Sequence, residues 1–265
     1  MQVCCNSHSY ARMLKSGGLT QLEWVDLCAN ELMVHGVEFA ASHFPRFDPD
    51  YLAQLKKLCA DRCLTVASFD HDVPLDPADP DAHGDLLERH IDVASALGAP
   101  LMRIVSHGPT GSPAVAWREL VRGLKRACVH AKERNVTLAL QPRQRTLVVT
   151  PEDAKRVMKE CDSAWLRLGL SALSLSEARD EWSEALQDTT IAVAPMSRLD
   201  TFGADEDLDY ITVLGLLRQH RFRGFISVLY SGAEDERPAV ARAVLWLRGM
   251  LAKDALKMAA TASVS

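Results

Sequence analysis

The chain has 265 residues and a mass of 29.2 kDa, which suits one large domain with a buried core. Hydrophobic residues make up 48% and charged residues 25%, so a disordered or fibrous chain is excluded. The net charge of −5 gives no basic footprint for nucleic acid, and no apolar run reaches the ~20 residues that span a bilayer. Neither nucleic acid nor membrane is therefore expected as a partner.

The first half of the chain alternates short β-rich runs with longer amphipathic runs. Leu22, Val25 and Leu32 recur at helical spacing, and Asp48 with Pro49 is typical of a helix start. We expect strands at 2–6, 36–41, 64–69 and 101–106, and helices at 19–34, 48–63, about 81–97 and about 113–134.

The second half continues the same alternation. Thr150 as cap, Pro151 at the first helical position and Glu152 in the first turn predict a helix start. Pro195 is an awkward residue inside an expected strand. We expect strands at 136–140, 166–170, about 191–199 and 224–230, and helices from 151, at about 176–186, at 207–220 and at 238–260.

Eight strand–helix units predict an α/β fold with a parallel sheet covered by helices. Their number and the chain length favour a single-domain (β/α)8 TIM barrel over residues 1–258. A doubly wound open sheet is the alternative, but residues 6–20 lack the G-x-G-x-x-G turn of dinucleotide-binding domains. Residues 259–265 are small and polar, and we expect a disordered tail there.

The cysteines and the N-terminus indicate the compartment. The seven cysteines are an odd number, and most lie in apolar periodic segments, which favours buried free thiols over a disulfide framework. Residues 1–10 lack the basic and apolar runs of a secretory signal. A cytoplasmic location is the expectation.

Four short motifs carry a family resemblance. They are GVEF at 36–39, DYL at 50–52, ALGAP at 96–100 ahead of Met102-Arg103, and GFISV at 224–228. In this order and spacing they resemble the xylose-isomerase-like TIM-barrel family, which includes sugar-phosphate isomerases and epimerases. The resemblance covers most of the chain and identifies no substrate.

The resemblance implies one divalent metal at the C-terminal mouth of the barrel. In the family the ligands are a Glu, an Asp, a His and a Glu on strands 5 to 8, and the metal stabilises an enediolate. In this chain those four positions hold Gln141, Ser171, Ser197 and Leu229. Gln carries no charge, Leu has no polar role, and Arg143 adds a positive charge that opposes a cation. We therefore predict that the usual metal site has been lost and expect no cofactor.

A replacement metal site remains an alternative. His43, His71, Asp72 and His107 follow strands 2 to 4, so they belong to the catalytic face of a barrel. Imidazole and carboxylate groups there suit Mn, Mg or Zn. The other interpretation, which we favour, is that these residues open ordinary polar loops.

Several further polar residues are candidates for the mouth. Glu38 lies in a strand that should be buried and needs a partner, for which Arg103 is suited; an ion pair and a substrate contact are both open. His8 either lines the mouth or is a solvated loop residue, the latter being preferred. The candidate substrate-binding residues are Glu38, His71, Arg103, His107, Gln141, Arg143 and Tyr230.

Three arginines allow two interpretations. Arg143, Arg145 and Arg198 either form a positive cluster for an anionic ligand or pair with the acidic loops beyond strands 7 and 8. The abundance of Asp and Glu in those loops favours salt bridges and disfavours a phosphate there.

Three functional hypotheses follow. The first is a sugar isomerase/epimerase-like barrel with a degenerate metal site, a pseudoenzyme that binds a small sugar-like or polyol ligand or serves as a partner subunit. The second is an active isomerase, epimerase or lyase that uses a different metal site or none. The third, an ordinary metal-dependent isomerase, requires the four ligand positions to be misaligned. The sequence leaves a homo-oligomer open.

Overall fold

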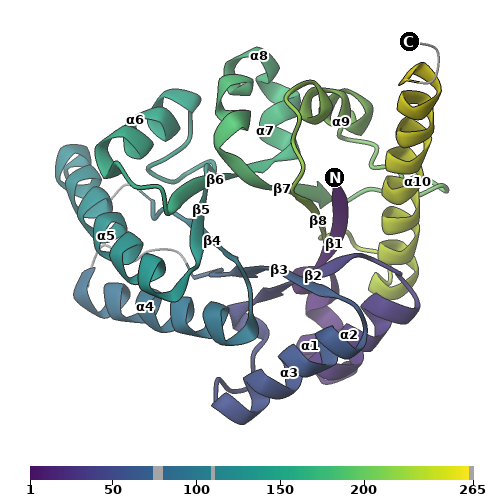
Figure 1. Ribbon diagram of the computed structural model, residues 1–265, viewed down its shortest axis with the longest axis horizontal. Helices are drawn as coiled ribbons and strands as arrows, with labels where there is room; N and C mark the ends of the chain where they lie inside the picture. Colours follow the sequence, from purple (N-terminus) through teal and green to yellow (C-terminus); the bar gives the residue numbers. More distant parts are fainter. Residues whose placement is uncertain (74–79, 109–110, 263–265) are drawn as a thin grey trace.

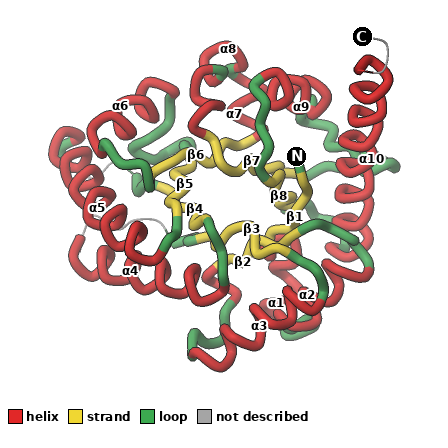
Figure 2. Tube along the Cα trace, viewed as in Figure 1, coloured by secondary structure: helices red, strands yellow, loops and turns green. Residues whose placement is uncertain are grey.

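The chain forms a closed ring of parallel strands surrounded by helices (Figures 1 and 2). The computed structural model describes residues 1–73, 80–108 and 111–262. Strand order follows chain order from β1 to β8, and β8 pairs with β1 to close the barrel. The single-domain (β/α)8 barrel predicted from the sequence is confirmed, and the open doubly wound sheet is not observed.

Each strand is five to eight residues long and is mostly buried. Apolar runs of this kind form central strands because helices cover the outside and side chains fill the inside. The strands are β1 (Gln2–Asn6), β2 (Gly36–Ala40), β3 (Thr65–Asp70), β4 (Leu101–Val105), β5 (Thr137–Gln141), β6 (Leu166–Ser171), β7 (Thr189–Met196) and β8 (Phe225–Tyr230).

The helices form the outer ring in Figure 1. Asp48 caps α3 as expected, since its carboxylate accepts from the Tyr51 N–H at 3.0 Å, and Thr150 forms a capping box with Asp153. The α-helices are α1 (Ala11–Ser16), α2 (Gln21–Asn30), α3 (Pro49–Asp61), α4 (Pro80–Leu97), α5 (Pro113–Arg134), α6 (Pro151–Cys161), α7 (Ala172–Glu177), α8 (Arg179–Trp182), α9 (Tyr210–Gln219) and α10 (Glu236–Ala262); the 3-10 turns are η1 (Ser7–Tyr10), η2 (Ala41–His43) and η3 (Glu184–Asp188).

Two predicted helices are wrong in extent. The helix expected at 19–34 is shorter, and a separate α1 precedes it; Gly17, with φ of 73°, ends α1 in the left-handed region that glycine tolerates. The helix expected at 176–186 is divided into α7, α8 and η3, because Ala178 leaves the helical conformation at φ −139°.

The end of β7 also differs from the prediction. The strand stops at Met196, and Ser197 already belongs to the following loop. Pro195 is tolerated near this end, where its carbonyl accepts the Tyr210 hydroxyl at 2.5 Å.

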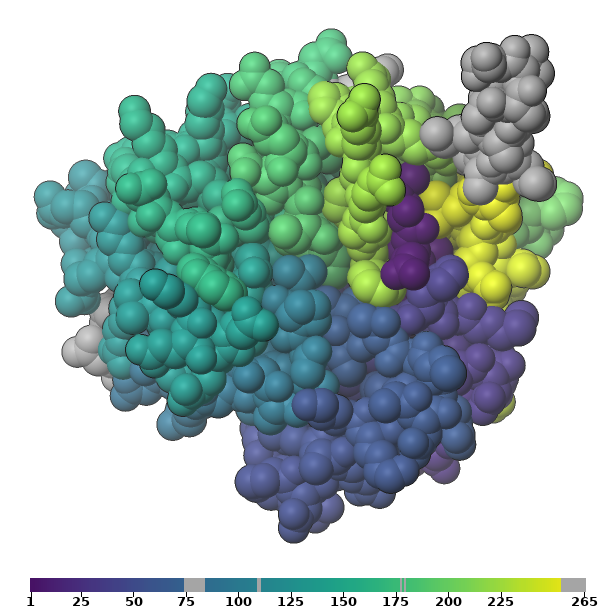
Figure 3. Space-filling view, in the orientation of Figure 1, coloured from purple at the N-terminus to yellow at the C-terminus, as the bar shows by residue number. Residues whose placement is uncertain are grey.

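The two ends of the ring meet next to the last helix. Gln2 pairs with Phe225, and the space-filling view shows the N-terminal residues (purple) beside the lime and yellow segments of the C-terminal part (Figure 3). Helix α10 continues to Ala262, beyond the predicted start of the tail at 259, and residues 263–265 lie outside the described part of the chain. None of the described helices is both long and apolar enough to cross a membrane.

Candidate ligand cavity at the barrel mouth

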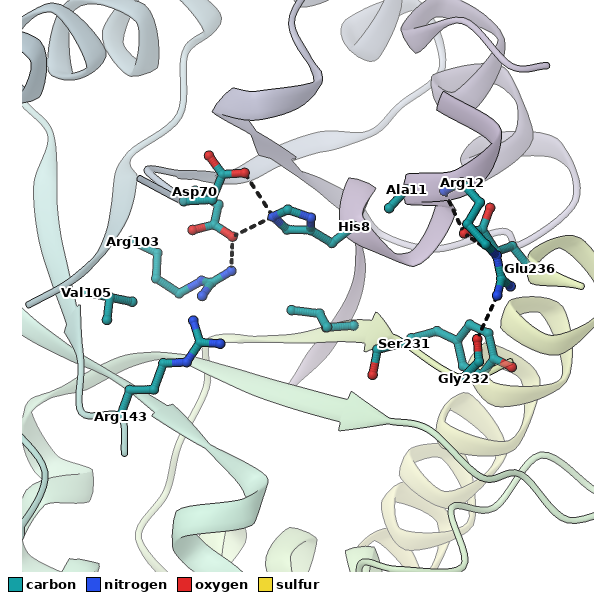
Figure 4. Close-up of a pocket in the computed structure, with 13 residues that line it drawn as sticks. His8, Ala11, Arg12, Asp70, Arg103, Val105, Arg143, Ser231, Gly232 and Glu236 are labelled. Carbon is teal, nitrogen blue, oxygen red and sulfur yellow. Dashed lines mark hydrogen bonds and ion pairs between the residues drawn. The ribbon is translucent and has the colours of Figure 1, made fainter. Parts of the chain in front are cut away.

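A cavity of about 500 Å³ opens at the carboxyl ends of the strands (Figure 4). Its lining comes from the last residues of β3 and β8, from Arg103 and Val105 of β4, and from the segments that follow β1, β3, β5 and β8. This is the face on which (β/α)8 barrels carry their ligand sites, because the strand ends and their loops converge there.

Arg103 of β4 organises the floor of the cavity. Its guanidinium donates to Glu38 Oε1 at 2.9 Å, to Gln141 Oε1 at 2.5 Å and to Asp70 Oδ2. The three acceptors come from β2, β5 and β3, so the network ties four strands together. The predicted pairing of Glu38 with Arg103 is confirmed.

Glu38 is fully buried beneath this guanidinium. Its other oxygen, Oε2, accepts from Asn6 Nδ2 at 2.7 Å and from the Ser227 hydroxyl at 2.5 Å. Burial by itself would raise the pKa of Glu38, but the charge and hydrogen bond of Arg103, with the bonds from Ser227 and Asn6, hold that pKa below its ordinary value. Glu38 is therefore an ionised, fully hydrogen-bonded structural carboxylate.

Asp70 is also buried but is in a different electrostatic state. Burial raises its pKa to about 6, since the Glu38 charge nearby adds to the desolvation and Arg103 offsets only part of it. Glu38 and Asp70 share one guanidinium, and Glu38 has the larger number of hydrogen-bond donors. Asp70 is therefore the carboxyl group of the floor that can gain or lose a proton near neutral pH.

His8 lies above this floor and pairs with a second aspartate. Its Nε2 is 3.0 Å from Asp72 Oδ2 and 3.9 Å from Asp70 Oδ2. The backbone N–H and hydroxyl of Ser42 also donate to Asp72. Although burial opposes ionisation, these bonds lower the pKa of Asp72 to about 2, so it stays charged and orients the His8 ring.

The opposite rim is built around Glu236 at the start of α10. Its carboxylate accepts the N–H groups of Arg12 at 2.8 Å and Met13 at 3.0 Å, which fixes the first turn of α1. The β8 loop approaches closely at Gly232, where a Cβ atom would collide with the Ser197 carbonyl and the Tyr230 ring. Only glycine fits this position without moving the rim.

The predicted ligand-binding residues fall into three places. Arg103, Arg143 and Tyr230 line the cavity, as expected for the mouth. Glu38 and Gln141 lie beneath it as buried partners of Arg103. His71 and His107 do not line it; His71 Nδ1 is 2.6 Å from Nδ1 of His90 on α4, and His107 Nδ1 is 2.6 Å from the Gly108 carbonyl.

The four residues considered for a replacement metal site are dispersed. His71 faces α4, His107 contacts its own loop, and Asp72 is engaged by His8 and Ser42. His43 has its Nδ1 on the Ser7 hydroxyl at 2.9 Å, and burial followed by the nearby His8 lowers its pKa to about 4. Within the described residues, no group of three or more His, Cys, Asp or Glu side chains has the arrangement to hold a metal ion.

The family's ligand positions offer no donor set that fits a divalent cation. The Gln141 oxygen already accepts from Arg103, and the Ser171 hydroxyl accepts from the Leu173 N–H at the start of α7. Ser197 is exposed on the loop after β7, and Leu229 is aliphatic. A site with a guanidinium at one corner and a hydrocarbon at another does not suit a hard cation.

The three arginines do not form a cluster. Arg198 pairs with Asp207 at 2.6 Å and with Glu206, in the acidic loop after β7, as the salt-bridge interpretation predicts. Arg143 and Arg145 are both exposed, but of the two only Arg143 lines the cavity.

Sequence reasoning undervalued His8 and Asp70. His8 lines the cavity, contrary to the preferred solvated interpretation, and its side chain is 28% exposed. Asp70, His71 and Asp72 follow one another, and the alternation of extended backbone turns the two aspartates to one side and His71 to the other. This two-residue alternation of side-chain direction predicts that Asp70, and not His71, faces the cavity.

Fold and site together define a closed (β/α)8 barrel with a polar cavity at its mouth. The profile of the xylose isomerase-like TIM barrel family matches residues 29–250, and the chain belongs to this family. Its structural neighbours include sugar epimerases, so the chain is sugar isomerase/epimerase-like in fold. No curated protein matches the sequence.

Solved structures share the fold at low sequence identity. An L-ribulose 3-epimerase has 16% identity and a TM-score of 0.76, over 98% of this chain and 97% of its own. The 3-keto-D-glucoside 4-epimerase of E. coli has 16% identity and a TM-score of 0.73, over 94% and 99%. A probable 3-DHS dehydratase of Bacillus anthracis has 15% identity and a TM-score of 0.73, over 94% and 99%.

Proposed function

We propose that the protein binds a small polyhydroxylated, sugar-like ligand in the mouth cavity and does so without a divalent metal. The observation that carries the proposal is the hydrogen bond from Arg103 to Gln141 Oε1. The amide oxygen that stands in place of the family's first carboxylate ligand already accepts from a guanidinium, whose positive charge opposes a cation beside it. Binding must then rest on hydrogen bonds from this chain's own side chains.

The composition of the cavity suits such a ligand. The lining combines the carboxyl and imidazole groups of Asp70 and His8 with apolar surface from Val105 and Leu229 around a volume of about 500 Å³. Sugars present hydroxyl groups that need such polar partners and C–H faces that pack on apolar groups. Two similar structures carry names of sugar epimerases, which supports the same ligand class.

Calorimetry against a panel of monosaccharides and polyols, with and without EDTA, tests the proposal. We expect millimolar or tighter binding that EDTA does not change. Leu229→Trp fills the cavity and should abolish binding, whereas Leu173→Trp, at an exposed leucine outside the cavity, should not. Absence of binding to the whole panel, or binding that EDTA removes, contradicts the proposal.

A second candidate function is metal-independent proton transfer beside a carbonyl group. The observation that favours it is Asp70, whose pKa of about 6 suits a general base and whose Oδ2 is 3.9 Å from His8 Nε2. Exchange of ketose C–H protons in deuterated water is the assay. Exchange that survives EDTA and disappears in Asp70→Asn supports catalysis; no exchange leaves ligand binding as the function.

We also propose a cytoplasmic location. All seven cysteines are free, and all except Cys63 are buried. Burial raises the pKa of Cys59 and Cys161 to about 12, which keeps these thiols protonated and unreactive. Cell fractionation with immunoblotting tests this, and recovery of the protein outside the reducing compartment contradicts it.

A further inference from the structure

The cationic side chains of the cavity differ in whether they already have partners. Arg103 is bound to Glu38, Asp70 and Gln141. Arg12 is 3.3 Å from the Glu236 carboxylate and donates to the carbonyl of Gly232 at 3.0 Å. By contrast, no carboxylate of the described residues lies within 4.0 Å of the Arg143 guanidinium.

The backbone of Arg143 is nevertheless firmly placed. Its N–H donates to the Val148 carbonyl at 3.0 Å, and its carbonyl accepts the Thr146 hydroxyl at 2.7 Å. The Val148 N–H in turn donates to the buried Ser106 hydroxyl at 3.1 Å, which ties this turn to the end of β4. A fixed turn therefore presents a long cationic side chain, and Figure 4 shows its guanidinium pointing into the cavity.

The cavity consequently has two electrostatic sides. Arg143 provides positive charge at the β5 edge, while Asp70 and Asp72 provide carboxylates at the β3 edge. In the described residues every side-chain contact of Asp70 is made by Oδ2, which leaves Oδ1 to accept from a ligand hydroxyl. A ligand that matches both sides is anionic at one end and hydroxylated at the other.

We propose that the ligand is a polyhydroxy carboxylate, that is, a sugar acid, whose carboxylate pairs with Arg143. This inference rests on the proposed function and specifies its ligand class. A planar carboxylate matches the two parallel N–H groups of a guanidinium, and its single charge balances that of Arg143, which has no carboxylate partner among the described residues. A phosphate brings nearly two charges toward Asp70 and Asp72, which repel it.

Calorimetry with sorbitol, gluconate and sorbitol 6-phosphate separates these classes, because the three probes share a carbon chain and differ at one end. We expect gluconate to bind about tenfold more tightly than sorbitol at low salt, as one charge-assisted pair implies. Arg143→Gln should remove that preference, so that gluconate and sorbitol bind the variant with equal affinity. Arg145→Gln, the same change in the same loop but outside the cavity, should keep it.

The outcomes distinguish this inference from the proposed function. Equal affinities for sorbitol and gluconate overturn the inference while ligand binding stands. Tighter binding of sorbitol 6-phosphate than of gluconate also overturns the carboxylate class, and an equal loss in Arg145→Gln overturns the assignment to Arg143. Absence of binding by all three probes, together with the sugar panel above, overturns both proposals.

Discussion

Replacing Arg103 by Met removes the positive charge at the centre of the barrel floor while keeping much of the side-chain volume. Arg103 is 4% exposed, and its partners Glu38 and Asp70 are 0% and 3% exposed. The variant leaves these carboxyl groups buried without a cation. Breaking a buried ion pair from one side costs about 3–5 kcal/mol, and we expect a loss of unfolding free energy of that size near neutral pH.

The loss should depend on pH with a definite sign. In the folded native protein the pKa of Glu38 lies below its ordinary value. The ionised Glu38 therefore stabilises the fold at pH values above its ordinary pKa, and this stabilisation is lost as the pH falls through the lowered pKa of the folded state. Without Arg103, burial raises the pKa of Glu38, and the folded variant gains a proton on acidification. The difference between native protein and variant should therefore shrink as pH falls from 7.5 to 5.

Urea unfolding followed by circular dichroism at both pH values measures this. Glu38→Gln in the Arg103→Met background should restore part of the stability, because it removes one uncompensated charge. Arg126→Met is the matched control, since Arg126 also binds two carboxylates, Asp85 and Glu88, but on the exposed surface, where little change is expected. A loss below about 1 kcal/mol for Arg103→Met, or one independent of pH, refutes the reasoning.

Three further predictions concern single side chains. Asp70→Asn should change the pH dependence of stability. The pKa of Asp70 in the folded protein, about 6, exceeds its ordinary value of 3.8, so the free energy of unfolding of the native protein falls as pH rises from about 4 to 6. Denaturation curves of the variant measured across that range should lack this fall. Glu236→Gln weakens the two hydrogen bonds to the start of α1 and should cost about 1 kcal/mol, seen as a lower Tm, with the exposed Glu234→Gln as control. Gln141→Glu should form an ion pair with Arg103 and bind no Mn²⁺; stoichiometric Mn²⁺ after dialysis would contradict the proposed loss of the site.

The strands were the most predictable part of the fold. A buried parallel strand is a continuous apolar run, and β1 at Gln2–Asn6 was predicted to the residue. Helix limits were harder because they depend on single backbone conformations. Residues 172–188 contain no Pro or Gly to mark the break at Ala178, and α7 contacts β7 and α9, which are distant in the sequence.

The site could be predicted where a buried charged residue required a partner of opposite charge. It could not be predicted where the direction of a side chain decides whether the residue lines the cavity. Glu38 in an apolar strand required a cation, and Arg103 two strands away supplied it. His71 was chosen by residue type, although the alternation of extended backbone directs it to His90 and α4. Asn6 and Ser227 were missed because their role appears only when β1 and β8 close the ring around Glu38.

The Arg103 network also explains how two carboxyl groups can lie side by side in the floor of the cavity. Two buried carboxyl groups in one barrel repel each other, and a cation is needed to keep the floor folded. Arg103 supplies that charge covalently, with three hydrogen-bonded acceptors fixing its guanidinium. A second cation beside it would meet like-charge repulsion and find Gln141 already engaged. Neutralisation of this floor by arginine and neutralisation by a metal ion are therefore alternatives, and the proposed function assumes the first.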